Sequence, residues 1–490
     1  MRFYLALWVG KAVAWAISMF FPQRGTNKSG VIACRLAPRF LSGFTGIDPD
    51  KTIFITGTNG KSTSNNLVVH AFRTAGYRVA TNLEGANLFT GIATTLLKNS
   101  SMSGRLRADY LICEVDERSL ARVRSVIPAR YLCVTNIQKD QVQRNGDPDY
   151  IVRKIVGAMD DSMTVFVNNE EPRSSSLSAF AGRTVRFSVA PMKRDGETRA
   201  GNETYSVTMP CPRCHDALVF TSYNLSKIGD FFCPSCGFAS HQDPDYRVES
   251  VDYGAKVFRM GDHDFHLEYD AAHFLYNYSL CYAVATEFGL TTDQIGRGFE
   301  TFRNLGGRLE EFRYESTSLR YLRVKQENPE TFQSAIDDIA PRGHPDLPRC
   351  HPDEVRISAI INNDCDGDPA SGRMTTDSGA ILVLGLNLVH DIIPYYSNTA
   401  YFFDCDLTPL FERGVEACVC FGVTNCFDAA TRLSYAGFPE DKIICVDSND
   451  PKTVLDAVAA CHVPTAYLIT MLGEYEGLRT FADRWMEGRS

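Results

Sequence analysis

Hydrophobic positions in the first part of the chain follow an alternation of short apolar runs and amphipathic segments. Apolar runs of strand length lie at residues 51–56, 77–81, 109–114, 129–136 and 164–168. Apolar residues at helical spacing lie at residues 61–75 and 118–125. Strands that alternate with helices are typical of βαβ units, so the pattern predicts a parallel sheet.

The pattern changes near residue 190. Residues 200–245 are polar with short apolar runs, which indicates an insertion, and helical spacing returns at residues 270–289 and continues through residue 302. A second alternating region follows, with strands expected near residues 320–325, 357–362, 416–421, 442–446 and 465–470. Residues 364–398 are long, irregular and rich in Gly, Asp and Pro, so we expect an inserted loop there.

These patterns predict an α/β protein of several parts, as a chain of 490 residues also suggests. We expect an N-terminal helical segment at residues 1–45 and a central domain with a parallel sheet at residues 46–305, which contains the insertion. Gly306-Gly307-Arg308 is expected to be a hinge. A second α/β domain is expected at residues 306–490.

The N-terminal segment has three interpretations. Residues 3–21 are apolar except for Lys11 at their centre. A spanning helix would bury this Lys at a cost of about 3 kcal/mol, which disfavours a membrane span. A core-packed or surface-docked amphipathic helix is the first interpretation, and a membrane-interface helix and a signal or anchor are the alternatives.

Charge and cysteine content narrow the class of protein. The chain has 50 Lys and Arg against 59 Asp and Glu, a net charge of −9, which argues against a nucleic-acid binder. Twelve of the 16 Cys are scattered, often in apolar runs, as at Cys133 and Cys281. Free Cys in such runs behaves as a small core residue, so we expect a reducing, cytoplasmic compartment.

A candidate phosphate loop joins the first strand to the first helix. It reads Gly57-Thr58-Asn59-Gly60-Lys61-Ser62. Glycines let backbone N–H groups close on phosphate oxygens, and a helix N-terminus favours anions. Lys61 can reach the β- and γ-phosphates and the Ser62 hydroxyl can ligate Mg²⁺. Ile55 occupies the first Gly position of the motif G-x-x-x-x-G-K-[ST], and an ordinary strand–helix turn is the alternative.

A candidate metal site lies in the insertion. Cys211-x-x-Cys214 and Cys233-x-x-Cys236 are separated by 18 residues, the pattern of a zinc ribbon. Four thiolates leave no ligand position open for water, so the metal would be structural. A pair of redox dithiols, or a ribbon that has lost its metal, is the alternative.

These motifs resemble those of the Mur ligase superfamily, the ATP-dependent amide-forming enzymes of peptidoglycan and folate metabolism. The ATP loop of that family is similar to residues 56–63 here, and further similar segments follow in order at residues 84–87, 113–117, 135–147 and 307–310. One branch, the MurT subunits of lipid II isoglutaminyl synthase, resembles the chain over roughly residues 30–480. It shares the Glu-Val-Asp-Glu strand end, the four-Cys ribbon and a signature like residues 421–437.

The resemblance implies a reaction and a partner. ATP would phosphorylate a substrate carboxylate, and ammonia would attack the acyl phosphate. The substrate implied is the D-glutamate α-carboxylate of the lipid II stem peptide, which becomes D-isoglutamine. Ammonia would come from a GatD-like glutamine amidotransferase, and the membrane-tethered substrate would place the protein in the cytoplasm with contact to the inner membrane surface.

The resemblance also implies roles for individual residues. Lys61 and Glu114 would be catalytic, and Ser62 with Glu114 would hold Mg²⁺. The ATP-binding residues implied are Gly57, Thr58, Asn59, Gly60, Lys61, Ser62, Thr63, Asn136 on the adenine side and Arg308 at the hinge. Zinc would bind Cys211, Cys214, Cys233 and Cys236. In the C-terminal domain, Asp404, with Asp368 as its rival, would complete the Cys-His pair of the glutaminase.

Departures from the family leave two other functions open. Many Mur ligases have D-H-L-D-x-H after the fourth strand, where this chain has Asp140-Gln141-Val142-Gln143. The carbamylated Lys of several relatives has no identifiable equivalent, so a second Mg²⁺ site is not expected. The alternatives are a stand-alone Mur-type or folylpolyglutamate-type ligase that adds an amino acid, and a non-catalytic nucleotide-binding scaffold.

Overall fold

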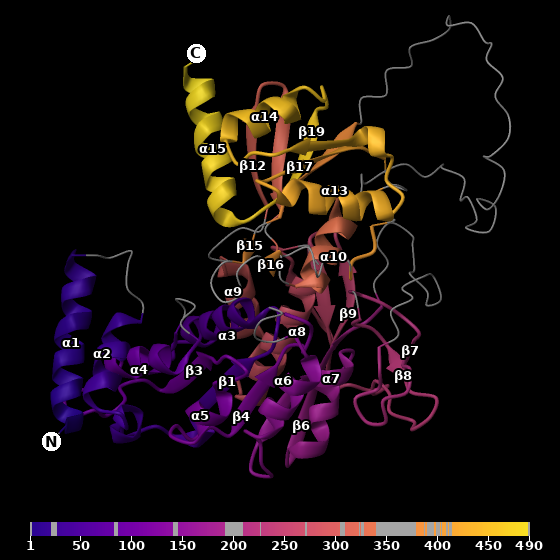
Figure 1. The fold of residues 1–490 in the computed structure, drawn as a ribbon. Helices are drawn as coiled ribbons and strands as arrows, with labels where there is room; N and C mark the ends of the chain where they lie inside the picture. The colour runs from indigo at the N-terminus through magenta and orange to yellow at the C-terminus, as the bar shows by residue number, and fades with distance from the viewer. Residues whose placement is uncertain are drawn as a thin grey trace, which may run out of the picture. The chain divides into compact units, whose positions relative to one another are not determined.

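The computed structural model divides into two compact units, Met1–Gly306 and Gly307–Ser490 (Figure 1). Each unit has its own sheet and its own hydrophobic core. The structure describes the chain outside residues 1, 21–26, 83–86, 141–145, 192–208, 226, 270–271, 304–308, 323, 325–327, 340–378, 387, 390–395, 398–401, 403, 408–409, 411–413 and 489–490.

A nine-stranded sheet forms the centre of the first unit. Its order is β11 (His263–His266), β10 (Val257–Met260), β9 (Tyr246–Asp252), β6 (Arg183–Val189), β5 (Thr164–Asn168), β4 (Tyr131–Val134), β1 (Thr52–Thr56), β3 (Tyr110–Glu114) and β2 (Val79–Ala80). The strands from β2 to β9 pair in parallel, and β9, β10 and β11 pair antiparallel. The predicted parallel sheet is confirmed, and the five predicted strands are all present.

Helices cover both faces of this sheet. Because successive side chains of a strand point to opposite faces, Ile53 and Ile55 of β1 belong to one core and Phe54 to the other. The first core is covered by α3 (Lys61–Thr74), α8 (Ala272–Glu287) and α9 (Thr292–Thr301). The second is covered by α2 (Lys28–Leu36), α4 (Phe89–Lys98), α5 (Leu120–Arg124) and α6 (Pro148–Val156), and α1 (Arg2–Phe20) packs on α2 and α4.

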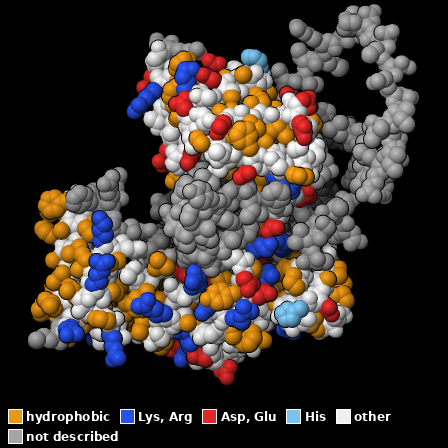
Figure 2. Space-filling model, viewed as in Figure 1, with side chains coloured by type: hydrophobic (Ala, Val, Ile, Leu, Met, Phe, Trp, Pro, Cys, Tyr) orange, Lys and Arg blue, Asp and Glu red, His pale blue; other side chains and the backbone are white. Residues whose placement is uncertain are grey.

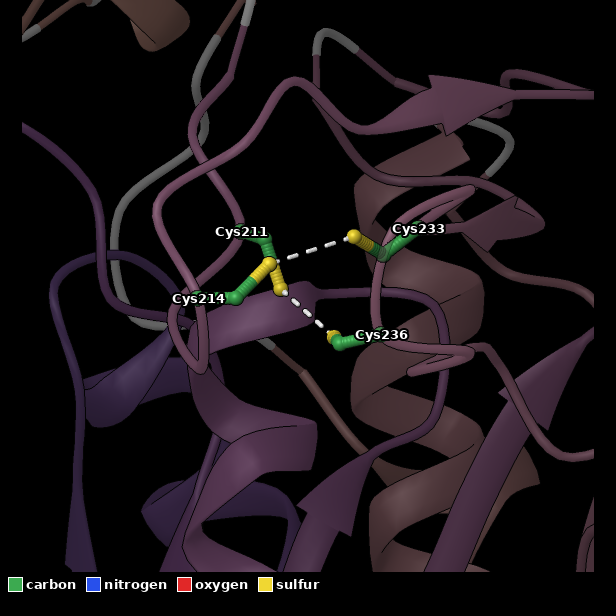
Figure 3. Close-up of side chains that lie close together, drawn as sticks. All are labelled: Cys211, Cys214, Cys233 and Cys236. Atoms are coloured by element: carbon green, nitrogen blue, oxygen red, sulfur yellow. Dashed lines mark hydrogen bonds between the residues drawn. The ribbon is translucent and has the colours of Figure 1, made fainter.

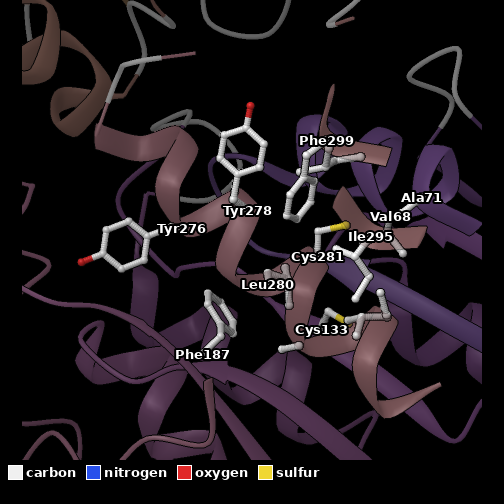
Figure 4. Packing of buried hydrophobic residues seen from close by; sticks show 14 of the residues in the cluster. Val68, Ala71, Cys133, Phe187, Tyr276, Tyr278, Leu280, Cys281, Ile295 and Phe299 are labelled. Atoms are coloured by element: carbon white, nitrogen blue, oxygen red, sulfur yellow. The ribbon is translucent and has the colours of Figure 1, made fainter. Parts of the chain in front are cut away.

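Seven of the scattered cysteines that the structure describes are buried core residues, in both units: Cys113, Cys133, Cys281, Cys405, Cys418, Cys420 and Cys426. Figure 4 shows Cys133 of β4 and Cys281 of α8 among Val68, Ile295 and Phe299. Burial raises the pKa of the Cys133 and Cys281 thiols well above the ordinary value, which keeps them protonated. They therefore act as small apolar side chains, as the sequence pattern indicated.

The second unit contains a six-stranded sheet. Its order is β12 (Leu309–Tyr314), β13 (Thr317–Leu322), β19 (Thr465–Ile469), β14 (Ala380–Gly385), β17 (Val415–Phe421) and β18 (Ile443–Val446), parallel except for the β12–β13 hairpin. The helices of this unit are α10 (Pro329–Asp338) and α13 (Asn425–Tyr435), which contribute to one core, and α14 (Pro451–Ala459) and α15 (Leu472–Glu487), which contribute to the other.

The interpretation of residues 364–398 as an irregular inserted loop is wrong for residues 380–385. These residues form β14, which lies between β19 and β17 and is buried along its whole length. The run Ala-Ile-Leu-Val-Leu-Gly is apolar on both sides because the strand is covered on both faces, so it lacks the alternation that marks a strand. The strand expected at residues 357–362 lies outside the described residues.

Candidate nucleotide site and cysteine cluster

The turn between β1 and α3 has a backbone that only glycine adopts easily. Gly57 has φ +128° and Gly60 has φ +78°. A Cβ atom at Gly57 would lie 2.3 Å from Thr135 Oγ1, and one at Gly60 would lie 2.8 Å from Asn277 Oδ1. The turn is therefore a narrow cradle at the N-terminus of α3, with room for backbone alone.

Lys61 is buried and lies over this cradle. Its Nζ donates hydrogen bonds to the Gly57 carbonyl, to the Thr58 carbonyl at 3.2 Å and to Glu117 Oε1 at 2.8 Å. Burial lowers the pKa of Lys61, but Glu117 and Glu114 outweigh burial, and the net shift of the pKa is upward. Lys61 is therefore charged at neutral pH, with its charge at the mouth of the loop.

Ser62 and Glu114 form the second part of the site. Ser62 Oγ donates to Glu114 Oε2 at 2.6 Å, and Asn87 Nδ2 donates to Glu114 Oε1 at 3.0 Å. The backbone of Glu114, at the carboxyl end of β3, is held by two hydrogen bonds with the Asn82 side chain, at 2.9 and 2.8 Å. A hydroxyl beside a carboxylate supplies the oxygen ligands that Mg²⁺ prefers.

Asn136, at the end of β4, contacts the phosphate loop directly. Its Oδ1 accepts from Asn59 N at 2.9 Å, its Nδ2 donates to Asn59 O at 3.0 Å, and its carbonyl accepts from Thr58 N at 2.8 Å. Asn136 therefore positions the loop, and its role beside the adenine stays a prediction.

The segment after Asn136 is held by a buried carboxyl group. Glu171 caps α7 (Pro172–Ser176), where its Oε2 accepts from Ser174 N at 2.7 Å, and the same oxygen accepts from Ile137 N at 3.1 Å. Burial raises the pKa of Glu171 to about 7. This contact joins α7 to the edge of the nucleotide site.

Several residues of the site had no role predicted from the sequence, and Glu117 and Asn277 are the two nearest the phosphate loop. Glu117 was quoted within a motif, but only the structure shows its ion pair with Lys61. Asn277 lies on α8, where its Oδ1 accepts from Ser64 Oγ at 2.9 Å, and its buried Nδ2 has no hydrogen-bond partner among the residues that the structure describes. A polar residue inside the apolar run of residues 272–287 was the available signal.

These features fit ATP with Mg²⁺. The cradle excludes side chains, Lys61 supplies positive charge, Ser62 and Glu114 supply paired oxygens, and Asn277 Nδ2 is a buried donor beside Gly60. All of these groups gather at the carboxyl edge of the parallel sheet, which is where open α/β sheets bind ligands.

The four ribbon cysteines form one cluster (Figure 3). Their sulfur atoms all lie within 4.8 Å of one another. Two contacts join the knuckles: Cys211 Sγ to Cys236 Sγ at 3.7 Å and Cys214 Sγ to Cys233 Sγ at 3.4 Å. At a Zn–S distance of about 2.3 Å, sulfurs at tetrahedral corners lie about 3.8 Å apart, so the spacing fits zinc.

The two knuckles have the same backbone geometry. In the first, Cys211 N donates to Asp216 O at 2.7 Å, and His215 has φ +69°. In the second, Cys233 N donates to Phe238 O at 2.7 Å, and Gly237 has φ +71°. The knuckles are joined by a hairpin of β7 (Val219–Phe220) and β8 (Phe231–Phe232), which is the architecture of a zinc ribbon.

Three predicted residues belong to the hinge and the second unit. Arg308 and Asp368 lie outside the described residues. Asp404 is exposed, on a segment that α13 and α10 hold in place. Arg432 Nη2 donates to Cys405 O at 2.8 Å, and Asp406 N donates to Gln333 Oε1 at 2.7 Å.

Comparisons with known proteins find similar sequences and a similar fold. Residues 55–208 match the family model of the Mur ligase middle domain. The chain is similar to subunit MurT of lipid II isoglutaminyl synthase (glutamine-hydrolyzing) from Staphylococcus aureus (strain COL), with 27% identity over 317 residues, which cover 64% of this chain and 70% of the relative. The subunit of the same name from Streptococcus pneumoniae (strain R6) is 24% identical over 473 residues, 95% of this chain and 93% of the relative.

The fold agrees as well. The structure of a pseudomurein peptide ligase type C from Methanothermus fervidus has a TM-score of 0.62 at 14% identity, and the match covers 91% of this chain and 81% of that one.

Proposed function

We propose that this chain, which has the fold of the Mur ligases and carries their middle domain, is an ATP-dependent ligase that amidates a peptidoglycan precursor. The substrate is the α-carboxylate of D-glutamate in the stem peptide of lipid II, and the product is D-isoglutamine. The observation that carries the proposal is the Ser62–Glu114 pair beside Lys61 at the phosphate loop. The similarity to MurT subunits along the chain supports the choice of substrate.

The residues of the site position ATP and the substrate carboxylate and compensate the negative charge of the phosphates. ATP supplies the phosphoryl group, and Mg²⁺ neutralises phosphate charge. The substrate carboxylate forms a bond to the γ-phosphorus as ADP leaves, and ammonia then displaces phosphate from the acyl carbon. Lys61, kept charged by Glu117, balances negative charge that develops in the first step. Ser62 and Glu114 would hold the metal, and the backbone N–H groups of Gly57 to Gly60 would bind the phosphates.

A direct assay tests the proposal. The purified chain is incubated with ATP, Mg²⁺, ammonium and lipid II, and the product is analysed by mass spectrometry. The proposal predicts conversion of one carboxylic acid of the stem peptide to an amide. Addition of an amino acid would indicate a stand-alone ligase, and absence of any ATP-dependent product would indicate a scaffold.

Ammonia is supplied by a GatD-like glutaminase that docks on the second unit. Asp404 is exposed on a segment whose backbone accepts hydrogen bonds from Arg432 and Gln333. It orients the catalytic His of that partner, as the third member of a triad does. Exposed apolar side chains of the same unit, at Val423, Phe427 and Tyr435, give the partner a surface to cover.

We expect Asp404→Asn to separate the two half-reactions. In complex with a GatD-like subunit, glutamine-dependent amidation falls by about 10²–10⁴-fold, because the amide no longer orients the His. Ammonium-dependent amidation remains at the wild-type rate. The exposed Asp441 provides the control, since Asp441→Asn leaves both rates unchanged. Wild-type glutamine use by the Asp404 variant would remove Asp404 from this role.

The cysteine cluster holds one structural Zn²⁺. All four sulfurs lie within 4.8 Å of one another, and close contacts join the two knuckles, which favours a shared metal over two separate dithiols. All four ligand positions are taken by Cys, so the metal stabilises the insertion and takes no part in the reaction.

A further inference from the structure

Helix α1 presents an apolar face that nothing in the described first unit covers. Trp8 and Trp15 are 51% and 62% exposed, and the other large exposed apolar side chains of the helix are Tyr4, Leu5, Met19 and Phe20. Tyr4, Trp8, Trp15 and Met19 recur at spacings of four and seven, so they lie along one side of the helix. Figure 2 shows hydrophobic side chains along α1, at the left of the view.

The opposite side of α1 is firmly packed on the protein. Ala6, Leu7 and Gly10 are buried, and a Cβ atom at Gly10 would lie 2.2 Å from Leu97 Cδ1 of α4. Near the start of the helix, the Phe3 ring packs against Phe40 and Phe44, with ring centroids 5.5 and 5.3 Å apart. The helix is therefore part of the first unit.

Lys11 shows why the helix does not cross a membrane. The helix is long and apolar enough to do so by length and composition. However, Lys11 Nζ donates hydrogen bonds to Leu97 O at 2.6 Å and to Ser100 O at 2.7 Å, at the C-terminal end of α4. Trp8 Nε1 also donates to Met102 O at 3.0 Å. A spanning helix would have to break these bonds and its packing, so only its outer side is available to lipid.

The surroundings of α1 are strongly basic. Residues 1–47 and 85–108, which include α1, α2 and α4, contain nine Lys and Arg and no Asp or Glu, although the whole chain has a net charge of −9. The described basic residues that are exposed in these segments are Arg2, Lys28, Arg35, Arg39, Lys98, Arg105 and Arg107. These two segments are thus net positive because they lack acidic residues, although they hold only nine of the 50 Lys and Arg of the chain.

We propose that the outer face of α1, with these basic residues, binds the surface of an anionic lipid bilayer. An apolar helix face flanked by Lys and Arg is typical of helices that lie in the membrane interface. Trp and Tyr favour the headgroup region, and Lys and Arg are attracted to anionic headgroups. A second copy of this chain fits the face poorly, because self-association would bring two basic surfaces together. The inference does not require the proposed reaction, although it would place the site near a lipid-linked substrate.

Vesicle binding by the full chain tests the inference. The chain has three Trp, of which two lie on the outer face of α1, so its intrinsic fluorescence reports on this face. We expect co-sedimentation and a blue shift with vesicles of phosphatidylglycerol and phosphatidylcholine, weakened by high salt. Equal binding to pure phosphatidylcholine, or no binding to either vesicle, would overturn the proposal.

Acidic substitutions on the outer face of α1 provide a second test of vesicle binding. Trp15→Glu combined with Met19→Glu is expected to lower the vesicle partition coefficient at least tenfold, and the protein stays folded because both side chains are exposed. Phe180→Glu, at a side chain 45% exposed elsewhere in the unit, is the matched control and leaves binding unchanged. Unchanged vesicle binding by the double variant would overturn the proposal. So would a wild-type chain that is a dimer in solution and a double variant that has lost both vesicle binding and the dimer. The vesicle assay contains no nucleotide and no substrate. A negative result in it therefore rejects membrane binding and leaves the proposed function untouched.

Discussion

Replacement of Lys61 by Ala is expected to reduce ATP-dependent amidation by at least about 10²–10³-fold, since removal of one positioned charge from a transition state has effects of this size. The Lys61 ammonium lies over the phosphate loop and is the buried cation of the site among the described residues. Its loss leaves phosphate charge uncompensated. Single-turnover amidation with saturating ammonium measures the effect, and nucleotide binding by titration calorimetry shows whether ground-state affinity falls as well.

The control for this variant must also remove the charge of Glu117, the ion-pair partner of Lys61. Lys61→Ala leaves Glu117 buried without its ion pair, which by itself destabilises a protein by about 3–5 kcal/mol. The double variant Lys61→Ala with Glu117→Gln removes both charges and is expected to fold near the wild-type melting temperature while remaining inactive. Restored amidation in the double variant would mean that Lys61 has only a structural role.

Substitution of Cys236 by Ser is expected to release zinc and unfold the insertion. The zinc content falls from about one ion per chain to near zero, because three thiolates and a neutral hydroxyl do not complete the tetrahedral set. The free energy that zinc contributes to folding of small zinc domains is about 10–16 kcal/mol, so the ribbon does not survive without it. Elemental analysis and protection from proteolysis at residues 209–241 measure the two effects.

An equally exposed cysteine supplies the control. Cys445 and Cys236 are both exposed, so neither substitution removes much packing. Cys445→Ser is expected to keep the full zinc content and the wild-type proteolytic pattern. Zinc-free wild-type protein after purification under reducing conditions, or full zinc content in the Cys236 variant, would contradict the assignment of the cluster.

Local sequence was sufficient to predict a motif whose backbone conformation depends only on neighbouring residues. The phosphate loop and the two Cys knuckles were predicted because glycines with positive φ and short-range C-x-x-C turns need no distant partner. The contacts of Lys61 with Glu117 and of Ser64 with Asn277 were not predicted, since they join residues 56 and 213 positions apart. Such contacts depend on the order of strands in the sheet, which periodicity does not supply.

The second unit shows the same limit at the level of strands. β14 was missed because a central strand buried on both faces has no alternating pattern, and the irregular residues around it dominated the local composition. β6 of the first unit and β12 of the second were missed as well. β6 pairs on one side with β9, which is distant in the sequence, and β12 lies in the β12–β13 hairpin. Arg308 and Asp368 stay predictions, as does the triad role of Asp404.

Transfer of oxygen from substrate to phosphate tests the central claim most directly. Lipid II whose D-glutamate α-carboxylate carries a heavy isotope at both oxygens is incubated with the chain, ATP, Mg²⁺ and ammonium, and the released phosphate is analysed by mass spectrometry. Activation of the carboxylate at the Lys61 loop predicts one labelled oxygen in each phosphate formed, in step with amide formation. Unlabelled phosphate in the presence of amide would contradict the account.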